Sequence, residues 1–174
     1  EAAGFPSGHR ITLYARTVPD YQRKLAEVVS NQLERNLGWQ VDVDYSPDIV
    51  RFMDKIADDA DGLALFGWQA DYPSGRAIMH PLLASDQVAT PDNGLVNFSG
   101  WRNTQFDRYL DEASRQPNAT SRAESLLQAE RTALTDMAII PMVHLATAAL
   151  RSDRLTGLEM DHEGHPILAT AAFR

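Results

Sequence analysis

The spacing of apolar residues switches between two periods along residues 10–68, and this alternation constrains the fold more than any other feature. Residues 10–16 alternate between apolar and polar side chains, as a strand with one buried face does. From Asp20 the apolar residues recur at helical spacing until Gly38, where a left-handed C-terminal cap is expected. The expected inner face of this helix consists of Leu25, Val28, Val29, Leu33 and Leu37.

The same order then repeats. Residues 41–45 alternate as a second strand, and Ser46 and Pro47 are expected to supply the N-cap and first-turn proline of a short helix. The expected inner face of that helix consists of Ile49, Phe52, Met53 and Ile56. Residues 62–68 are apolar on both faces, which predicts a central strand. The sequence therefore predicts an α/β fold that starts β-α-β-α-β, with a mainly parallel sheet flanked by helices and ligands at the carboxyl ends of its strands.

The rest of the chain is expected to hold a loop, two helices and returning strands. Turn-forming residues predict a surface loop over 85–102. Asn103 is expected to cap the first helix, and Ser121 with Glu124 to form the capping box of a longer one. Residues 138–174 are expected to return as strands. The expected inward side chains are Phe106, Tyr109, Leu110 and Ala113 on the first helix, and Leu126, Leu127, Ala133, Leu134 and Met137 on the second. A length of 174 residues is enough to bury one core, so residues 1–174 are expected to form one domain.

Charge and composition exclude several function classes. The 174 residues carry a net charge of −8, which disfavours binding to nucleic acid or to an anionic membrane surface. Cysteine is absent, so disulfides, thiolate metal sites and a cysteine nucleophile are excluded. No apolar run approaches the roughly 20 residues that a membrane span needs. We find neither a phosphate-binding glycine loop nor a serine nucleophile elbow, and we therefore expect no cofactor and no enzymatic activity.

Two histidine-containing stretches leave alternatives open. His162, Glu163 and His165 superficially resemble a metal cluster, but Gly164 and Pro166 disfavour helical two-histidine geometry, so a solvated loop is the expected structure. His144 follows Pro141 in an apolar stretch. It is expected to be a hydrogen-bonded core or edge histidine, with a ligand contact as the alternative.

The stretch FGWQADYP, residues 66–73, is the best candidate for a binding site. It follows an apolar strand and combines the rings of Phe66, Trp68 and Tyr72 with the carboxylate of Asp71. A carboxylate beside aromatic surface can hold an ammonium group by a charge-assisted hydrogen bond, and the rings can add cation–π attraction. The alternative is a structural aspartate that caps a helix or stabilises a loop.

Five segments, in the right order, resemble the family 5 solute-binding proteins, the periplasmic oligopeptide- and dipeptide-binding proteins of ABC importers. These segments are EAAGFPSGHRITL, QLERNLGWQVDV, GLALFGWQADYP, NFSGWRNTQFDRYLDEA and ERTALTDMAIIPMVH. The resemblance runs almost end to end, but only onto the carboxyl-terminal lobe of that family. It implies that an amino-terminal lobe is missing from this chain.

The resemblance implies a role for the candidate site. In peptide-binding members the aspartate of the Gly-Trp-x-x-Asp stretch holds the ligand's free α-amino group, and Asp71 matches that position. Trp68 would flank the ligand. In many relatives another acidic residue follows, whereas here Arg76 does and could pair with Asp71 instead.

The resemblance also implies partners and a location. The expected partners are a short peptide or other small solute, the missing lobe and an ABC transporter permease, and the expected location is extracytoplasmic. The alternative is the ligand-sensing lobe of a cytoplasmic transcription regulator.

Overall fold

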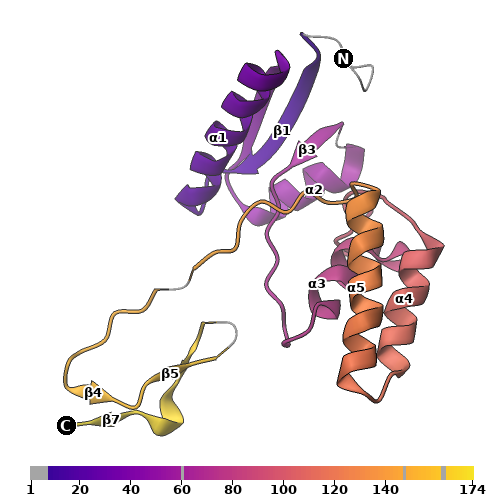
Figure 1. The fold of residues 1–174 in the computed structure, drawn as a ribbon. Helices are drawn as coiled ribbons and strands as arrows, with labels where there is room; N and C mark the ends of the chain where they lie inside the picture. The colour runs from indigo at the N-terminus through magenta and orange to yellow at the C-terminus, as the bar shows by residue number, and fades with distance from the viewer. Residues whose placement is uncertain (1–7, 60, 147, 162–163) are drawn as a thin grey trace. The chain divides into compact units, whose positions relative to one another are not determined.

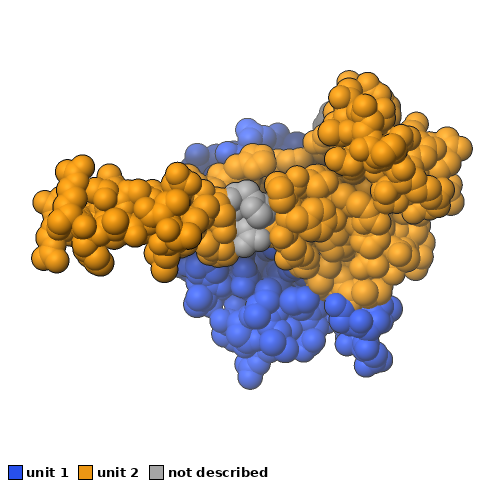
Figure 2. All heavy atoms as spheres, turned by 90° about the horizontal axis from the view of Figure 1, so that it is seen from below, with its two compact units in different colours: residues 1–67, 89–94 blue, residues 68–88, 95–174 orange. Residues whose placement is uncertain are grey.

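The chain folds into two compact units. The computed structural model describes residues 8–59, 61–146, 148–161 and 164–174. The first unit runs to Gly67 and includes Ala89–Gly94, and the second contains Trp68–Val88 and Leu95–Arg174 (Figures 1 and 2). That residues 1–174 act together as one ligand-binding lobe stays a prediction.

The first unit contains the predicted β-α-β-α-β order. Its elements are β1 (Arg10–Arg16), α1 (Asp20–Leu37), β2 (Gln40–Ser46), α2 (Ile49–Asp59) and β3 (Gly62–Ala64). The three strands are parallel in the order β2-β1-β3, with Leu13 level with Val43 on one side and Leu63 on the other. Leu13, Ala15 and Ala26 are fully buried between the sheet and α1. The α/β class and parallel sheet are therefore confirmed.

The third strand differs from its prediction. We expected a central strand over 62–68, but β3 is a short edge strand that ends at Ala64, and β1 occupies the centre. Pairing extends one residue further, where the Leu65 N–H donates to the Tyr14 carbonyl, and then the chain leaves the sheet. An apolar run identifies a strand but not its place in the order, because that place depends on how the crossovers pack.

Both helices of this unit, α1 and α2, were predicted, but some of their cap and buried residues differ from the prediction. Gly38 caps α1 in the left-handed conformation, as expected. Val28 and Leu37 were expected to be buried but are exposed, whereas polar Gln22 is buried and accepts a hydrogen bond from Arg16 Nε. Ser46 is not the cap of α2, because it ends β2; the Asp48 carboxylate accepts from the Arg51 N–H instead. Of the expected inner face of α2, Phe52 and Ile56 are buried while Ile49 is exposed.

Helices form the core of the second unit. They are α3 (Arg76–Leu83), the 3-10 turn η1 (Ser85–Gln87), α4 (Thr104–Arg115) and α5 (Ala119–Thr135). Asn103 caps α4 as predicted, but the side chain of Asn118, not of Ser121, caps α5. The core consists of Leu83, Ala84, Phe106, Leu110, Ala129 and Ala133. Leu127, Leu134 and Met137 were expected to be buried and are exposed.

Helix α3 was not predicted, because Pro81 lies inside it and the sequence around it resembles a loop.

Residues 85–102 were predicted to be a surface loop, but this connection contains the 3-10 turn η1 and a buried side chain. Asn97 is fully buried, and its Nδ2 donates to the carbonyls of Ala84 and Trp101 at 3.1 and 3.0 Å. A buried amide thus anchors this connection, which also pairs Val88 with Asn97.

The returning strands expected over 138–174 are present only near the end. Four strands of two residues each form antiparallel pairs: β4 (Leu155–Thr156) with β7 (Ala172–Phe173), and β5 (Glu159–Met160) with β6 (Pro166–Ile167). A 3-10 turn, η2 (Leu168–Thr170), precedes β7. The described residues of 138–150 form no strand, although their composition is β-prone, because no neighbouring strand of the described chain pairs with them. The expected helix end within residues 1–7 lies outside the described residues.

Candidate functional site

A hydrogen bond to α3 holds the indole of Trp68. Its Nε1–H donates to the Ala77 carbonyl at 3.0 Å, and the side chain keeps 37% of its surface exposed. Ala77 itself is buried in the first turn of α3. The polar edge of the ring is therefore fixed to the helix while part of the apolar ring surface stays available for contact.

Asp71 lies in the exposed connection between Trp68 and α3. Among the described residues, none donates a hydrogen bond to its carboxylate or pairs with it, Arg76 included. Asp71 also does not cap α3, whose first N–H, that of Arg76, is bonded to Ser74 Oγ at 3.3 Å. Neither the helix-cap alternative nor the Arg76 alternative is realised in this structure. An exposed carboxylate without an internal partner is free to accept a cationic group.

The other two aromatic candidates are placed differently. Tyr72 is exposed beside Asp71, and its carbonyl accepts from the Ser74 N–H at 2.7 Å, which makes the connection turn toward α3. Phe66 lies in the first unit and stacks on the fully buried Phe52, with ring centroids 6.3 Å apart. The Phe66 ring therefore contributes to packing on α2, while Trp68, Asp71 and Tyr72 lie within one short exposed segment.

His80 is a titratable group near this segment that sequence reasoning missed. It lies on α3, with Nε2 3.7 Å from the Asp86 carboxylate. Burial lowers the pKa of His80 below its usual 6.5, and the nearby positive charge of Arg76 lowers it further. Arg76 thus acts electrostatically on His80. The sequence signal for the effect of Arg76 on His80 is their four-residue spacing, which places two residues on the same face of a helix.

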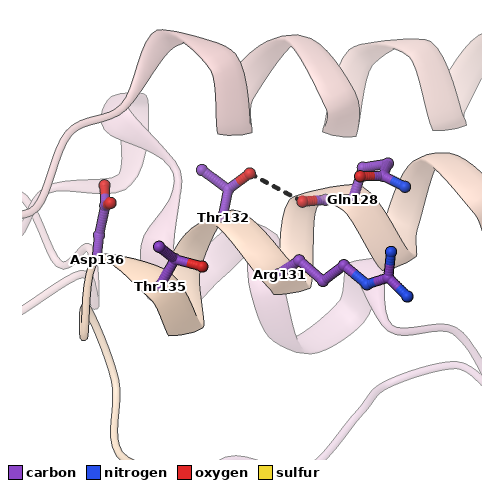
Figure 3. A pocket seen from close by; sticks show the side chains of 5 residues that line it. All are labelled: Gln128, Arg131, Thr132, Thr135 and Asp136. Carbon is purple, nitrogen blue, oxygen red and sulfur yellow. Dashed lines mark hydrogen bonds between the residues drawn. The ribbon is translucent and has the colours of Figure 1, made fainter.

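The two surface depressions found among the described residues are not lined by the candidate residues. A shallow surface depression of about 240 Å³ is lined by Gln128, Arg131, Thr132, Thr135 and Asp136. Figure 3 shows that these side chains come from α5 and its C-terminal end, where Thr132 Oγ1 donates to the Gln128 carbonyl at 2.9 Å. A depression along one helix supplies no converging groups, so we assign it no ligand.

The structure describes only part of the two histidine-containing stretches. His162 and Glu163 lie outside the described residues. His165 Nδ1 is 3.6 Å from the Asp161 carboxylate in the β5–β6 turn. His144 is exposed and belongs to no strand, so the expectation of a hydrogen-bonded core or edge histidine is wrong. The described part of the chain contains no group of three or more potential ligands placed to hold a metal ion, and none of its helices has the length and apolarity to cross a bilayer.

Comparison with known proteins relates this sequence to peptide-binding proteins. No family model matches it. It is 25% identical over 155 residues to the oligopeptide-binding protein OppA of Bacillus subtilis, a match that covers 89% of this chain and 27% of OppA. It is also 29% identical over 111 residues to the peptide transport periplasmic protein SapA of Haemophilus influenzae, covering 64% of this chain and 19% of SapA. The chain is similar to these two peptide-binding proteins, which are members of the family 5 solute-binding proteins. It spans 27% of the length of OppA and 19% of the length of SapA.

Solved structures of similar proteins show the same fold. Clavulanic acid biosynthesis oligopeptide binding protein 2 has a TM-score of 0.86 at 22% identity, with 99% of this chain and 32% of that one covered. The dipeptide-binding protein of Pseudoalteromonas sp. SM9913, solved with Met-Leu, has a TM-score of 0.75 at 24% identity, covering 99% and 34%. This chain therefore has the fold of one part of a periplasmic binding protein. The comparisons give no support to the regulator alternative.

Proposed function

We propose that this chain is a non-enzymatic solute-binding lobe of an ABC importer's substrate-binding protein, and that its ligand is a short peptide or another amine-bearing solute. The single observation that carries the proposal is the similarity to OppA, which covers 89% of the chain and so includes residues 66–73 near its middle. The names of OppA and SapA refer to peptide binding and transport, and SapA is named as periplasmic. An extracytoplasmic location and a permease partner follow from this proposal.

The geometry of residues 68–72 supports the ligand class. Asp71 offers a carboxylate that has no hydrogen-bond or ion-pair partner among the described residues, and Trp68 offers a ring whose Nε1–H is already bonded to the Ala77 carbonyl. A free α-amino group would donate to the carboxylate, while the ring would cover an adjacent apolar part of the ligand. Tyr72 can extend that aromatic surface.

The proposal is tested by NMR titration of the labelled chain with trialanine and with N-acetyl-trialanine. We expect shifts of the Trp68 indole and of the amides near Asp71 with the free peptide, and their loss with the acetylated one, because acetylation removes the charged amino group. Asp71→Asn should abolish the difference between the two peptides.

Asp92→Asn is the matched control, since Asp92 is also exposed but lies in the loop before Gly94. It should leave the titration unchanged. Equal shifts with both peptides, or an unchanged titration in Asp71→Asn, would contradict the assigned role of Asp71.

A further inference from the structure

The guanidinium of Arg76 has no hydrogen-bond or ion-pair partner within the described chain. Among the described arginines only Arg16 and Arg76 are half-buried, and Arg16 Nε donates to Gln22 Oε1 at 3.1 Å. Of the donors of Arg76, only the backbone N–H has a partner among the described residues, Ser74 Oγ at 3.3 Å. A half-buried charge without a partner has lost part of its hydration with no hydrogen bond in exchange. The side chain is therefore suited to bind an anion from outside the chain.

Arg76 belongs to the same part of the second unit as the candidate binding residues. It is the first residue of α3, and the Trp68 Nε1–H donates to the carbonyl of the next residue, Ala77, at 3.0 Å. This bond holds the first turn of α3 against the edge of the Trp68 ring. Trp68, Asp71 and Arg76 all lie within Trp68–Val88 of that unit.

The connection between Asp71 and Arg76 is short and folded. Five residues of chain span at most about 18 Å when fully extended. Here the Ser74 N–H donates to the Tyr72 carbonyl at 2.7 Å and the Ala77 N–H donates to the Ser74 carbonyl at 3.0 Å, so the chain turns twice. A carboxylate and a guanidinium thus lie in one compact segment without pairing with each other. A ligand that carries both charges can bind both groups.

We propose, on the basis of the proposed function, that Arg76 selects ligands that carry a carboxylate close to their α-amino group. Asp71 would accept from the ammonium group, and the planar guanidinium of Arg76 would donate to the ligand carboxylate through two parallel N–H groups. Arg76 is then a specificity-determining residue of the same site.

Two sources supply this chemistry in short peptides. One is an acidic side chain at either of the first two positions, and the other is the free carboxylate of a dipeptide. Each further residue adds about 3.3 Å to an extended peptide, so in longer peptides the C-terminal carboxylate moves away from the amino group. The side chains of the first two residues stay near it at any peptide length.

NMR titration of the labelled chain tests the inference with two pairs of peptides. Asp-Asp-Ala and Asn-Asn-Ala differ in side-chain charge, whereas Ala-Ala and its C-terminal amide differ in the free carboxylate. We expect the carboxylate-bearing member of at least one pair to bind about 10-fold more tightly than its neutral partner, as a hydrogen bond between charged groups allows. The pair that shows the preference identifies the source of the carboxylate.

Arg76→Gln should bring the two members of that pair to the same affinity, because it removes the charge. Arg76→Lys should keep part of the preference, since lysine retains the charge but not the planar fork. Arg131→Gln is the matched control, because Arg131 is an exposed arginine of α5 and its loss changes the net charge by the same amount. It should leave the preference unchanged.

Equal affinities within both pairs would overturn the inference, and so would a preference that persists in Arg76→Gln. A loss in Arg76→Lys as complete as in Arg76→Gln would also overturn it, because recognition of charge should survive in part.

The inference and the proposed function fail separately when trialanine and N-acetyl-trialanine are titrated alongside. Discrimination between these two without any carboxylate preference would contradict the role of Arg76 alone. A carboxylate preference that depends on Arg76, without any effect of acetylation, would contradict the amino-group role of Asp71 alone.

Discussion

At the level of single residues, burial and hydrogen bonding decided roles that residue type alone did not. Asn97 belongs to an N-x-Ser pattern, yet its side chain is fully buried and donates to two backbone carbonyls while accepting from Ser99 Oγ at 2.8 Å. Its amide is therefore a structural anchor. Asp71 shows the reverse, because this residue could have capped a helix but is exposed and has no side-chain partner in the described part of the chain.

His80 should make stability depend on pH in a definite direction. Its folded-state pKa is lowered from 6.5, chiefly by burial and also by Arg76. The unfolded chain then binds more protons than the folded chain in the window just below 6.5, so the free energy of unfolding falls as pH drops through that window. His80→Gln should remove this part of the pH dependence.

Urea unfolding of both proteins at pH values from about 5 to 8 measures the effect. NMR titration should also place the His80 midpoint in the folded chain below the midpoint in the urea-unfolded chain. A folded midpoint above the unfolded one would mean that the Asp86 carboxylate outweighs burial.

At the level of elements, an asparagine side chain caps the N-terminus of each long helix of the second unit, α4 and α5, but only one of the two asparagines also bonds to another helix end. Asn118 Oδ1 accepts from the N–H groups of Thr120 and Ser121. Asn103 Oδ1 accepts from Gln105 and Phe106, and its Nδ2 also donates to the Asp136 carboxylate at 2.9 Å, which ties the start of α4 to the end of α5.

Asn118→Ala should therefore lower the free energy of unfolding by about 1 kcal/mol, as the loss of a cap does. Asn103→Ala should cost about 2 kcal/mol, because it also removes a hydrogen bond to a charged group. Urea unfolding followed by circular dichroism compares the two, with Asn36→Ala on the exposed surface of α1 as the control. Equal losses in the two cap variants would show that the bond to Asp136 adds no stability.

At the level of the whole molecule, the candidate binding residues Trp68, Asp71 and Tyr72 are exposed, and neither of the two depressions found among the described residues is lined by them. Binding sites for small ligands normally enclose most of the ligand surface, and closure of two lobes expels water and adds contacts. We expect the chain alone to bind short peptides with a Kd of about 1 mM, and the complete two-lobed protein to bind them at about 10 µM or tighter.

Isothermal titration calorimetry of the complete protein, with NMR titration of the chain alone, measures the difference. The same peptides should be used in both, together with Asp71→Asn in the complete protein as the control for the site. Equal affinities would mean that this chain contains the entire binding site.

The sequence by itself determined the order of the first five elements, the cap at Gly38 and the cap at Asn103, because these depend on local periodicity and short-range hydrogen bonds. It also singled out the short stretch that holds Trp68, Asp71 and Tyr72. Its errors arose where local sequence preference and the final structure disagree. Helix α3 is an example, because Pro81 disfavours a helix that nevertheless forms there.

Only the tertiary structure decided which apolar residues are buried and which strands find partners. β1 is central because both neighbours pair with it, and residues 140–146 and 148–150 form no ladder with another strand of the described chain. Likewise, the bond from Trp68 to Ala77 joins a strand exit to a helix that sequence reasoning did not foresee. The free energy of such contacts is set by burial and packing that exist only after the chain has folded.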